Sequence, residues 1–130
     1  MDGAGKQRHP VAGFHGHHQT FADRRGIKAF DTLEALLERI DVLHVCVPPA
    51  LHEEVTVKAL AQGVFPIVEK PLTGYFGGGA KDFNGRTASM TEAREGALES
   101  IRRMRDAEAG SKARMLYAEN WVYAPTIQKE

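Results

Sequence analysis

The chain has 130 residues, an apolar fraction of 42% and equal numbers of acidic and basic residues, 17 of each. A chain of this length is one domain or part of one. Its balanced charge gives no electrostatic basis for binding nucleic acid or an anionic membrane, and no stretch is long and apolar enough to span a bilayer. The first residues lack the apolar core of a secretory signal, so the expected compartment is the cytoplasm.

The first third of the chain predicts short strands alternating with short helices. Apolar residues at 11–14 and 27–30 predict two brief strands, and residues 19–25 predict a helix between them. A second helix is expected over 31–40, with Asp31 as the capping residue. This alternation is typical of an α/β domain with a parallel sheet.

The histidine run raises the question of a metal site and the single cysteine that of a disulfide, and neither is predicted. The run His15-Gly16-His17-His18 lies in a strand-to-helix turn, where adjacent histidines are usually solvated. A metal site needs three or four convergent ligands held by supporting hydrogen bonds. The single cysteine, Cys46, cannot form an internal disulfide and is expected to be a small buried hydrophobe within a strand. The predicted metal content is therefore none.

The most regular stretch, residues 41–73, predicts a strand, a helix and a second strand. Val42–Val47 is an apolar, β-branched run typical of a strand covered on both faces, and it stops at Pro48-Pro49. A helix over 51–62 leads to the strand Phe65–Val68. Parallel strands joined by a helix need a right-handed crossover, so the turns that follow them lie at one edge of the sheet. Ligands of open α/β sheets bind at that edge.

The second strand is followed by two charged residues, Glu69 and Lys70, and then by Pro71. Charged side chains are costly in a sheet interior, so these two are expected to face a cleft or each other. Position alone leaves two explanations open. One is a local ion pair that closes the strand, and the other is a role facing a ligand.

These residues carry a resemblance to a known family. The turn Pro48-Pro49-Ala50-Leu51-His52 and the later Glu69-Lys70-Pro71-Leu72, spaced across a strand–helix–strand unit, resemble the dinucleotide-binding domain of the glucose–fructose oxidoreductase / inositol dehydrogenase / MocA family of NAD(P)-dependent oxidoreductases. The resemblance extends back through residues 22–40 and forward to 115–125. The implied fold class is α/β, a partial Rossmann-like dinucleotide-binding domain with a parallel sheet.

Two parts of the family's pattern have no counterpart in the sequence. The first βα unit with its G-x-G-x-x-G loop is missing, and so is the C-terminal sheet domain. Gly77-Gly78-Gly79 lacks the required spacing and follows the second strand, so a flexible loop is expected there. The predicted organisation is a flexible lead-in at 1–10, a partial dinucleotide-binding domain at 11–119, and the start of a truncated substrate domain at 120–130.

After the glycine run the sequence predicts a long helix and a further strand. The helix covers residues 91–109 and begins at a capping box formed by Ser89 and Glu92. The strand covers residues 114–122. The buried side of the helix is predicted to consist of Ala93, Ala97, Leu98, Ile101 and Met104.

The resemblance implies an NAD(P)-dependent oxidoreductase that transfers hydride between NAD or NADP and a sugar, polyol or related hydroxyl or carbonyl substrate. Lys70 is the implied catalytic residue, beside the nicotinamide and the substrate oxygen. A cis peptide bond before Pro71 would fit the tight turn. The implied cofactor-binding residues are Pro48, Pro49, His52, Glu69, Lys70 and Pro71. The implied substrate-side residues are Asn120 and Tyr123.

The alternative is a non-catalytic remnant or binding module that keeps only part of the nucleotide-binding scaffold. The missing loop and second domain favour it for the isolated polypeptide, which is expected to be inactive if this alternative holds. An unpaired strand edge also predicts homo-oligomerisation or poor solubility. A Schiff-base enzyme at Lys70 ranks last, because the adjacent Glu69 favours the charged ammonium. The sequence does not separate NAD from NADP.

Overall fold

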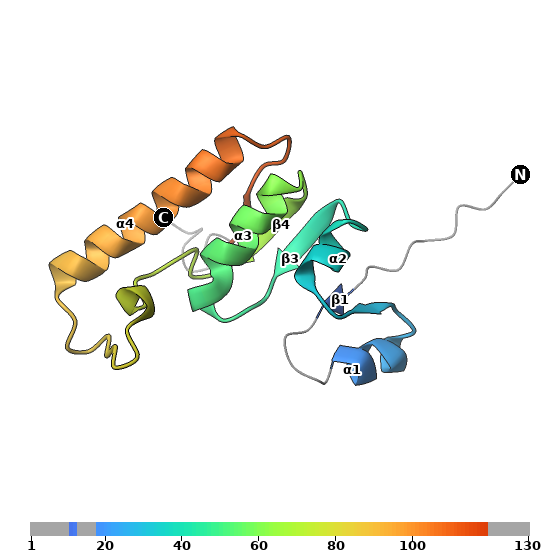
Figure 1. Cartoon of the computed structure of the whole chain (residues 1–130), viewed down its shortest axis with the longest axis horizontal. Helices are drawn as coiled ribbons and strands as arrows, with labels where there is room; N and C mark the ends of the chain where they lie inside the picture. Colours follow the sequence, from blue (N-terminus) through green and yellow to red (C-terminus); the bar gives the residue numbers. More distant parts are fainter. Residues whose placement is uncertain (1–10, 13–17, 120–130) are drawn as a thin grey trace, which may run out of the picture. The chain divides into compact units, whose positions relative to one another are not determined.

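The computed structural model describes residues 11–12 and 18–119. The chain divides into two compact units, Met1–Asp41 and Val42–Glu130 (Figure 1). In chain order the elements are β1 (Val11–Ala12), α1 (His18–Arg25), β2 (Ala29–Phe30), α2 (Leu33–Leu37), β3 (Val42–Val45), the 3-10 turn η1 (Pro49–Leu51), α3 (His52–Ala61), β4 (Phe65–Glu69), the 3-10 turn η2 (Gly77–Gly79), α4 (Met90–Ala109) and β5 (Leu116–Ala118).

The first unit is a parallel strand pair with two short helices packed on it. β1 and β2 pair through Val11 with Ala29 and through Ala12 with Phe30, and α1 and α2 both contact the pair. Its core consists of Ala22, Leu36 and Leu37, each at most 3% exposed. The predicted alternation of strands and helices is confirmed here.

The cap of α2 lies one residue later than predicted. Thr32 has an extended backbone, and its hydroxyl accepts a hydrogen bond from the Ala35 amide at 3.1 Å. The prediction of Asp31 was therefore wrong. Both residues have side chains suited to capping, and the extended conformation at Thr32 places its oxygen over the free amides of the first turn.

The second unit contains a parallel sheet in the order β3-β4-β5. The register places Val42 beside Phe65, Val45 beside Val68, and Glu69 beside Ala118. α3 contacts β3 and β4, and α4 contacts α3 (Figure 1). This arrangement confirms the predicted parallel sheet and the strand–helix–strand unit.

The two faces of this sheet have different surroundings. Under α3 lie Val45 and Val68, which are 1% and 0% exposed. On the opposite face Val42, Phe65 and Leu116 are 48%, 38% and 47% exposed. The prediction that β3 is covered on both faces was therefore wrong for the described residues of this unit. A strand with one exposed face is normally recognised by alternating apolar and polar residues. When the exposed face is also largely apolar, this alternation is missing and the run looks like a strand covered on both faces.

The helices of this unit begin and end close to the predicted residues. α3 is followed by Gly63, whose φ of 72° is the left-handed value expected after a helix. Ser89 caps α4, because its hydroxyl accepts from the Glu92 amide at 3.5 Å, as predicted, whereas the Glu92 carboxylate accepts from the Tyr75 hydroxyl. On its inner side Met104 and Ser100 are buried, whereas Leu98 is 36% exposed. No helix in the described ranges is long and apolar enough to cross a membrane.

The pairing of the strands indicates which strand the described structure lacks. In a doubly wound sheet with the order 3-2-1-4-5-6, strand 1 lies between strands 2 and 4. Without it, strands 2 and 3 remain as a pair, and strands 4, 5 and 6 remain as a triple. The described strands form one pair, β1-β2, and one triple, β3-β4-β5. The topology thus agrees with the predicted partial Rossmann-like fold in which the first βα unit has no counterpart.

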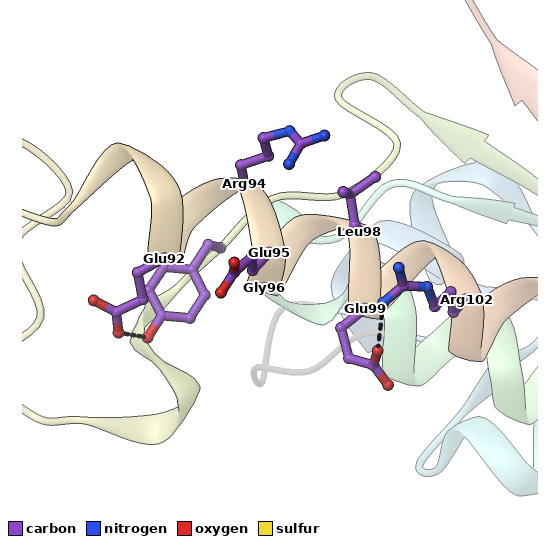
Figure 2. A pocket seen from close by; sticks show the side chains of 8 residues that line it. Glu92, Arg94, Glu95, Gly96, Leu98, Glu99 and Arg102 are labelled. Atoms are coloured by element: carbon purple, nitrogen blue, oxygen red, sulfur yellow. Dashed lines mark hydrogen bonds and ion pairs between the residues drawn. The ribbon is translucent and has the colours of Figure 1, made fainter.

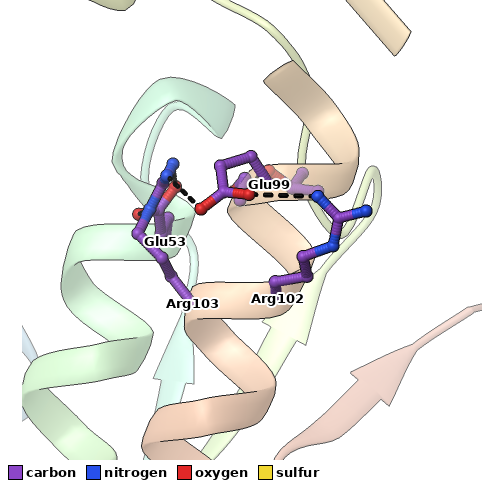
Figure 3. A network of polar contacts seen from close by, with 6 residues as sticks. Glu53, Glu99, Arg102 and Arg103 are labelled. Atoms are coloured by element: carbon purple, nitrogen blue, oxygen red, sulfur yellow. Dashed lines mark hydrogen bonds and ion pairs between the residues drawn. The ribbon is translucent and has the colours of Figure 1, made fainter. Parts of the chain in front are cut away.

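α3 and α4 are joined at their outer surfaces by an ion-pair network (Figure 3). The Arg103 guanidinium donates to both carboxylate oxygens of Glu53, with Nη2 and Oε2 2.9 Å apart. Arg103 and Arg102 also pair with Glu99 at 3.5 and 3.1 Å. Hydrogen bonds from Arg103, with a smaller contribution from Ser100, lower the pKa of Glu53, although partial burial acts in the opposite direction.

This network predicts a pH-dependent contribution to stability. The pKa of Glu53 is lower in the folded chain than in the unfolded chain. The pair therefore stabilises the fold above about pH 4.3, the ordinary value for glutamate, and this contribution is lost as the pH falls through the lowered folded value. At neutral pH we expect Glu53→Gln to reduce the free energy of unfolding by about 0.5–1 kcal/mol, measured by urea denaturation.

Glu54→Gln is the matched control. It removes the exposed ion pair with Lys58 on the same helix, in which Lys58 Nζ and Glu54 Oε1 are 3.0 Å apart. The free energy of unfolding should fall by about 0.3–0.5 kcal/mol. The difference in the free energy of unfolding between Glu53→Gln and the unmutated chain should become smaller as the pH falls. A difference that stays constant from neutral pH down to pH 3 would contradict the assignment.

Candidate functional site

Two polar turns meet at the carboxyl edge of the β3–β4 pair. Because Val45 lies beside Val68 in a parallel register, the two strands end at the same edge. The chain then enters Pro48-Pro49 after β3 and Lys70-Pro71 after β4. The predicted common edge is confirmed. Below, "the strand-tip site" means Pro48, Pro49, His52, Glu69, Lys70 and Pro71.

A single imidazole joins the two turns. His52 is the first residue of α3, and it is 1% exposed. Its Nδ1 lies 2.9 Å from the carbonyl oxygen of Pro71, and its Nε2 lies 3.0 Å from the carbonyl oxygen of Val47. Carbonyl oxygens only accept hydrogen bonds, so a neutral ring donates to one of them and a doubly protonated ring donates to both. His52 thereby sets the separation between the turn after β3 and the turn after β4.

The turn after β4 is also attached to α4. The hydroxyl oxygens of Thr73 and Ser100 are hydrogen-bonded at 2.6 Å, and Ser100 is 3% exposed. The Lys70–Pro71 peptide bond is cis, as the sequence suggested. The strand-tip site is therefore held by α3 through His52 and by α4 through Ser100.

The segment that follows the turn is packed rather than a plain loop. Tyr75 lies on α4 at Gly96, where an added Cβ would be 2.3 Å from the ring, and its hydroxyl donates to Glu92. Phe83 contacts Tyr75 edge to face, with ring centroids 5.3 Å apart. A flexible loop was predicted for these residues because their composition is glycine-rich. The two aromatic contacts with distant residues were not visible in that composition.

Glu69 and Lys70 have different surroundings. Lys70 is exposed, whereas Glu69 is half-buried and its Oε1 lies 3.0 Å from His44 Nε2. Within the described ranges Glu69 thus pairs with His44 rather than with Lys70. Sequence reasoning missed His44. The available signal was one polar residue inside an otherwise apolar strand.

Cys46 also differs from its prediction, because it is exposed rather than buried. It follows β3 and lies two residues after His44, on the open face of the sheet. Partial burial of the thiol group, and then the charge of Glu69, raise the pKa of Cys46. The two remaining predicted residues, Asn120 and Tyr123, lie outside the described residues.

An open hollow of about 680 Å³ lies along α4, away from the strand tips (Figure 2). Its lining consists of Tyr75, Glu92, Arg94, Glu95, Gly96, Leu98, Glu99 and Arg102. Figure 2 shows Glu99 and Arg102 paired with each other, and Glu92 holds Tyr75 and raises the pKa of its phenol. It includes no strand-tip residue, and several of its polar side chains are already paired with one another, so we assign it to the solvated face of α4.

The strand-tip site fits one half of a dinucleotide. An exposed lysine beside two proline turns at a carboxyl sheet edge suits a nicotinamide and its ribose. The pyrophosphate would need backbone amides from a G-x-G-x-x-G loop, and the sequence contains no such motif. The residues present therefore match the reactive end of the cofactor.

A parallel α/β sheet with its polar turns at the carboxyl edge defines a Rossmann-type nucleotide-binding domain. Residues 11–79, more than half of the chain, match the oxidoreductase family with an NAD-binding Rossmann fold, and the chain belongs to this family. The resemblance inferred from the two motifs is thus confirmed. No curated protein matches the chain significantly.

Solved structures of dehydrogenases have a similar fold. The WlbA dehydrogenase from Bordetella pertussis, in complex with NADH and UDP-GlcNAcA, is 18% identical with a TM-score of 0.69, covering 92% of this chain and 31% of its own. GenD2 from gentamicin A biosynthesis, in complex with NAD, is 21% identical with a TM-score of 0.68, covering 94% and 30%. The myo-inositol 2-dehydrogenase from Lactobacillus plantarum is 14% identical with a TM-score of 0.65, covering 92% and 30%.

These likenesses concern the fold, because all three identities are low. The chain spans 31%, 30% and 30% of the lengths of these three structures.

The position of His52 yields a testable prediction. His52→Leu removes both ring nitrogens and leaves at least one part-buried carbonyl oxygen without its donor, so the free energy of unfolding should fall by about 1–3 kcal/mol. His44→Gln, at an exposed histidine, should change it by no more than about 0.5 kcal/mol. Urea denaturation of both variants measures the difference. Equal effects would show that His52 does not hold the two turns together.

Proposed function

We propose that this chain acts in hydride transfer between a nicotinamide cofactor, NAD or NADP, and a hydroxyl-bearing carbon of a sugar, polyol or related substrate. One observation carries the proposal: exposed Lys70 lies at a carboxyl sheet edge where His52 joins the two strand-tip turns. Membership of an NAD-binding oxidoreductase family supports it. The similar structures named above include a nucleotide-sugar complex of one dehydrogenase and a dehydrogenase of myo-inositol.

In this proposal Lys70 is the catalytic residue. The bound cofactor supplies the hydride chemistry, and the protein positions and polarises the substrate. The Lys70 ammonium donates a hydrogen bond to the substrate oxygen. It thereby stabilises the negative charge that develops there when the carbon gains or loses hydride. An exposed cation at the end of a strand anchored from both sides is suited to this role.

The other strand-tip residues shape the wall around Lys70. Pro48 and Pro49 form the part that follows β3, and Glu69 and Pro71 flank the lysine. Because the His52 ring is buried and both its nitrogens face backbone carbonyls, we assign it a positioning role rather than a direct contact. Substrate-side roles for Asn120 and Tyr123 stay predictions. So does the division into a lead-in at 1–10, a cofactor domain at 11–119 and a substrate domain starting at 120.

A second function, a binding module without catalysis, is favoured by one observation. The sequence has no glycine-rich pyrophosphate motif, and the described strands form two separate sheets. Such a module would retain the scaffold without turning over a substrate. A cytoplasmic location, homo-oligomerisation and the choice between NAD and NADP stay predictions.

Cofactor binding and turnover distinguish the two functions. NADH and NADPH are titrated into the chain while their fluorescence is recorded, and oxidation of myo-inositol and of nucleotide sugars is followed by the absorbance of the reduced cofactor. Binding with turnover supports the oxidoreductase. Binding without turnover of any of these substrates, or no binding at all, supports the module.

The role of Lys70 is tested in the same assay. Lys70→Met keeps the aliphatic length and removes the charge, so kcat/KM should fall about 100-fold or more. Lys112→Met, at an exposed lysine beyond α4, should leave kcat/KM unchanged. An unchanged kcat/KM in Lys70→Met would remove the catalytic role assigned to this residue.

A further inference from the structure

Three side chains with different donor atoms converge on the open face of the β3–β4 pair. The ligand atoms of His44, Cys46 and Glu69 all lie within 4.8 Å of one another. We propose that this His44–Cys46–Glu69 cluster binds a borderline-soft divalent cation of the zinc class. This proposal does not depend on hydride transfer, and it revises the expectation that the chain holds no metal.

Strand geometry brings these residues together. His44 belongs to β3, and Cys46 directly follows the last residue of that strand, with its sulfur within 4.8 Å of the other two ligand atoms. Glu69 lies on β4, one residue beyond Val68, which pairs with Val45. β4 is the central strand and pairs on both sides, through Val45 with β3 and through Ala118 with β5. The backbone that carries the cluster is therefore held by two strand ladders.

The donor set matches the cation class. Imidazole nitrogen, thiolate sulfur and carboxylate oxygen are the usual ligands of zinc, and three protein ligands plus water form its usual open site. Hard cations such as Mg²⁺ and Ca²⁺ select oxygen ligands and would not use Cys46. The combination of sulfur and nitrogen donors thus favours zinc-like ions over the abundant hard cations.

The distances allow coordination after a small side-chain movement. His44 Nε2 and Glu69 Oε1 are already 3.0 Å apart. In a tetrahedral site with bonds of about 2.0–2.3 Å, ligand atoms lie roughly 3.3–3.7 Å apart. Because no two of the three ligand atoms are more than 4.8 Å apart, the adjustment needed to reach these distances is about 1 Å.

Exposure and charge also suit a cation. His44 and Cys46 are exposed, so an ion reaches them without unfolding the sheet. The Glu69 carboxylate supplies negative charge beside the other two ligand atoms, and a thiol that coordinates a metal ion does so as the thiolate.

Cobalt substitution tests the site directly. Co²⁺ bound to a thiolate gives a sulfur-to-metal charge-transfer band, and Cys46 is the only cysteine in the chain, so the band reports this position alone. We expect the band to saturate at one Co²⁺ per chain and to disappear when Zn²⁺ is added. Cys46→Ser should abolish it. His44→Gln and Glu69→Gln should each weaken Co²⁺ binding by at least about tenfold.

Two controls separate this site from adventitious binding. The double variant His17→Gln/His18→Gln removes two histidines that are adjacent to each other in the N-terminal histidine run. It should leave the charge-transfer band unchanged. X-ray absorption of the zinc-loaded, unmutated chain should show one sulfur ligand together with nitrogen and oxygen ligands, and this measurement needs no variant to fold. The proposal is overturned if no band forms, if the absorption spectrum lacks sulfur, or if His44→Gln and Glu69→Gln leave Co²⁺ binding unchanged. None of these readouts requires cofactor binding, so they are distinguishable from failure of the proposed oxidoreductase function.

Discussion

The contact on which the strand-tip site depends is the His52 imidazole between the carbonyl oxygens of Val47 and Pro71. Among the described residues, no other side-chain hydrogen bond joins the turn after β3 to the turn after β4, and the Thr73–Ser100 hydrogen bond attaches only the latter to α4. A buried ring with one nitrogen beside each of these carbonyl oxygens makes the separation of the two turns a property of α3 as well as of the sheet. Lys70 lies one residue before Pro71, so the position of its backbone follows from the same contact. This explains how a short turn on the surface can hold a charged side chain in a defined place.

The strand pairing shows which strands of a doubly wound sheet the described residues form. β3 pairs with β4 alone, and β1 pairs with β2 alone, among the described strands. In the doubly wound order, the first strand leads into the loop that holds a pyrophosphate. The described residues carry the strand tips to which the proposed function assigns the nicotinamide. The anchoring of Glu69 and Lys70 by β4, α3 and α4 does not require the missing strand.

Local interactions made much of the fold predictable. Ser89 capping α4 and Gly63 ending α3 involve residues close in the sequence, and both were recognisable from residue type and spacing. Where two neighbours offered similar local chemistry, as with Asp31 and Thr32, the choice depended on backbone conformation. The common edge of the two turns was also predictable, because it follows from the handedness of a parallel crossover.

Taken alone, the sequence determined the parallel strand–helix–strand unit, the family and the residues at the strand tips, because each has a pattern of residue types at short spacing. Only the tertiary structure decided that Glu69 pairs with His44, that Cys46 is exposed and that Tyr75 packs on Gly96. Each of these contacts or exposures depends on which residues of separate elements come to lie on the same face. That is set by strand register and helix packing, over separations at which residue type and periodicity carry no signal.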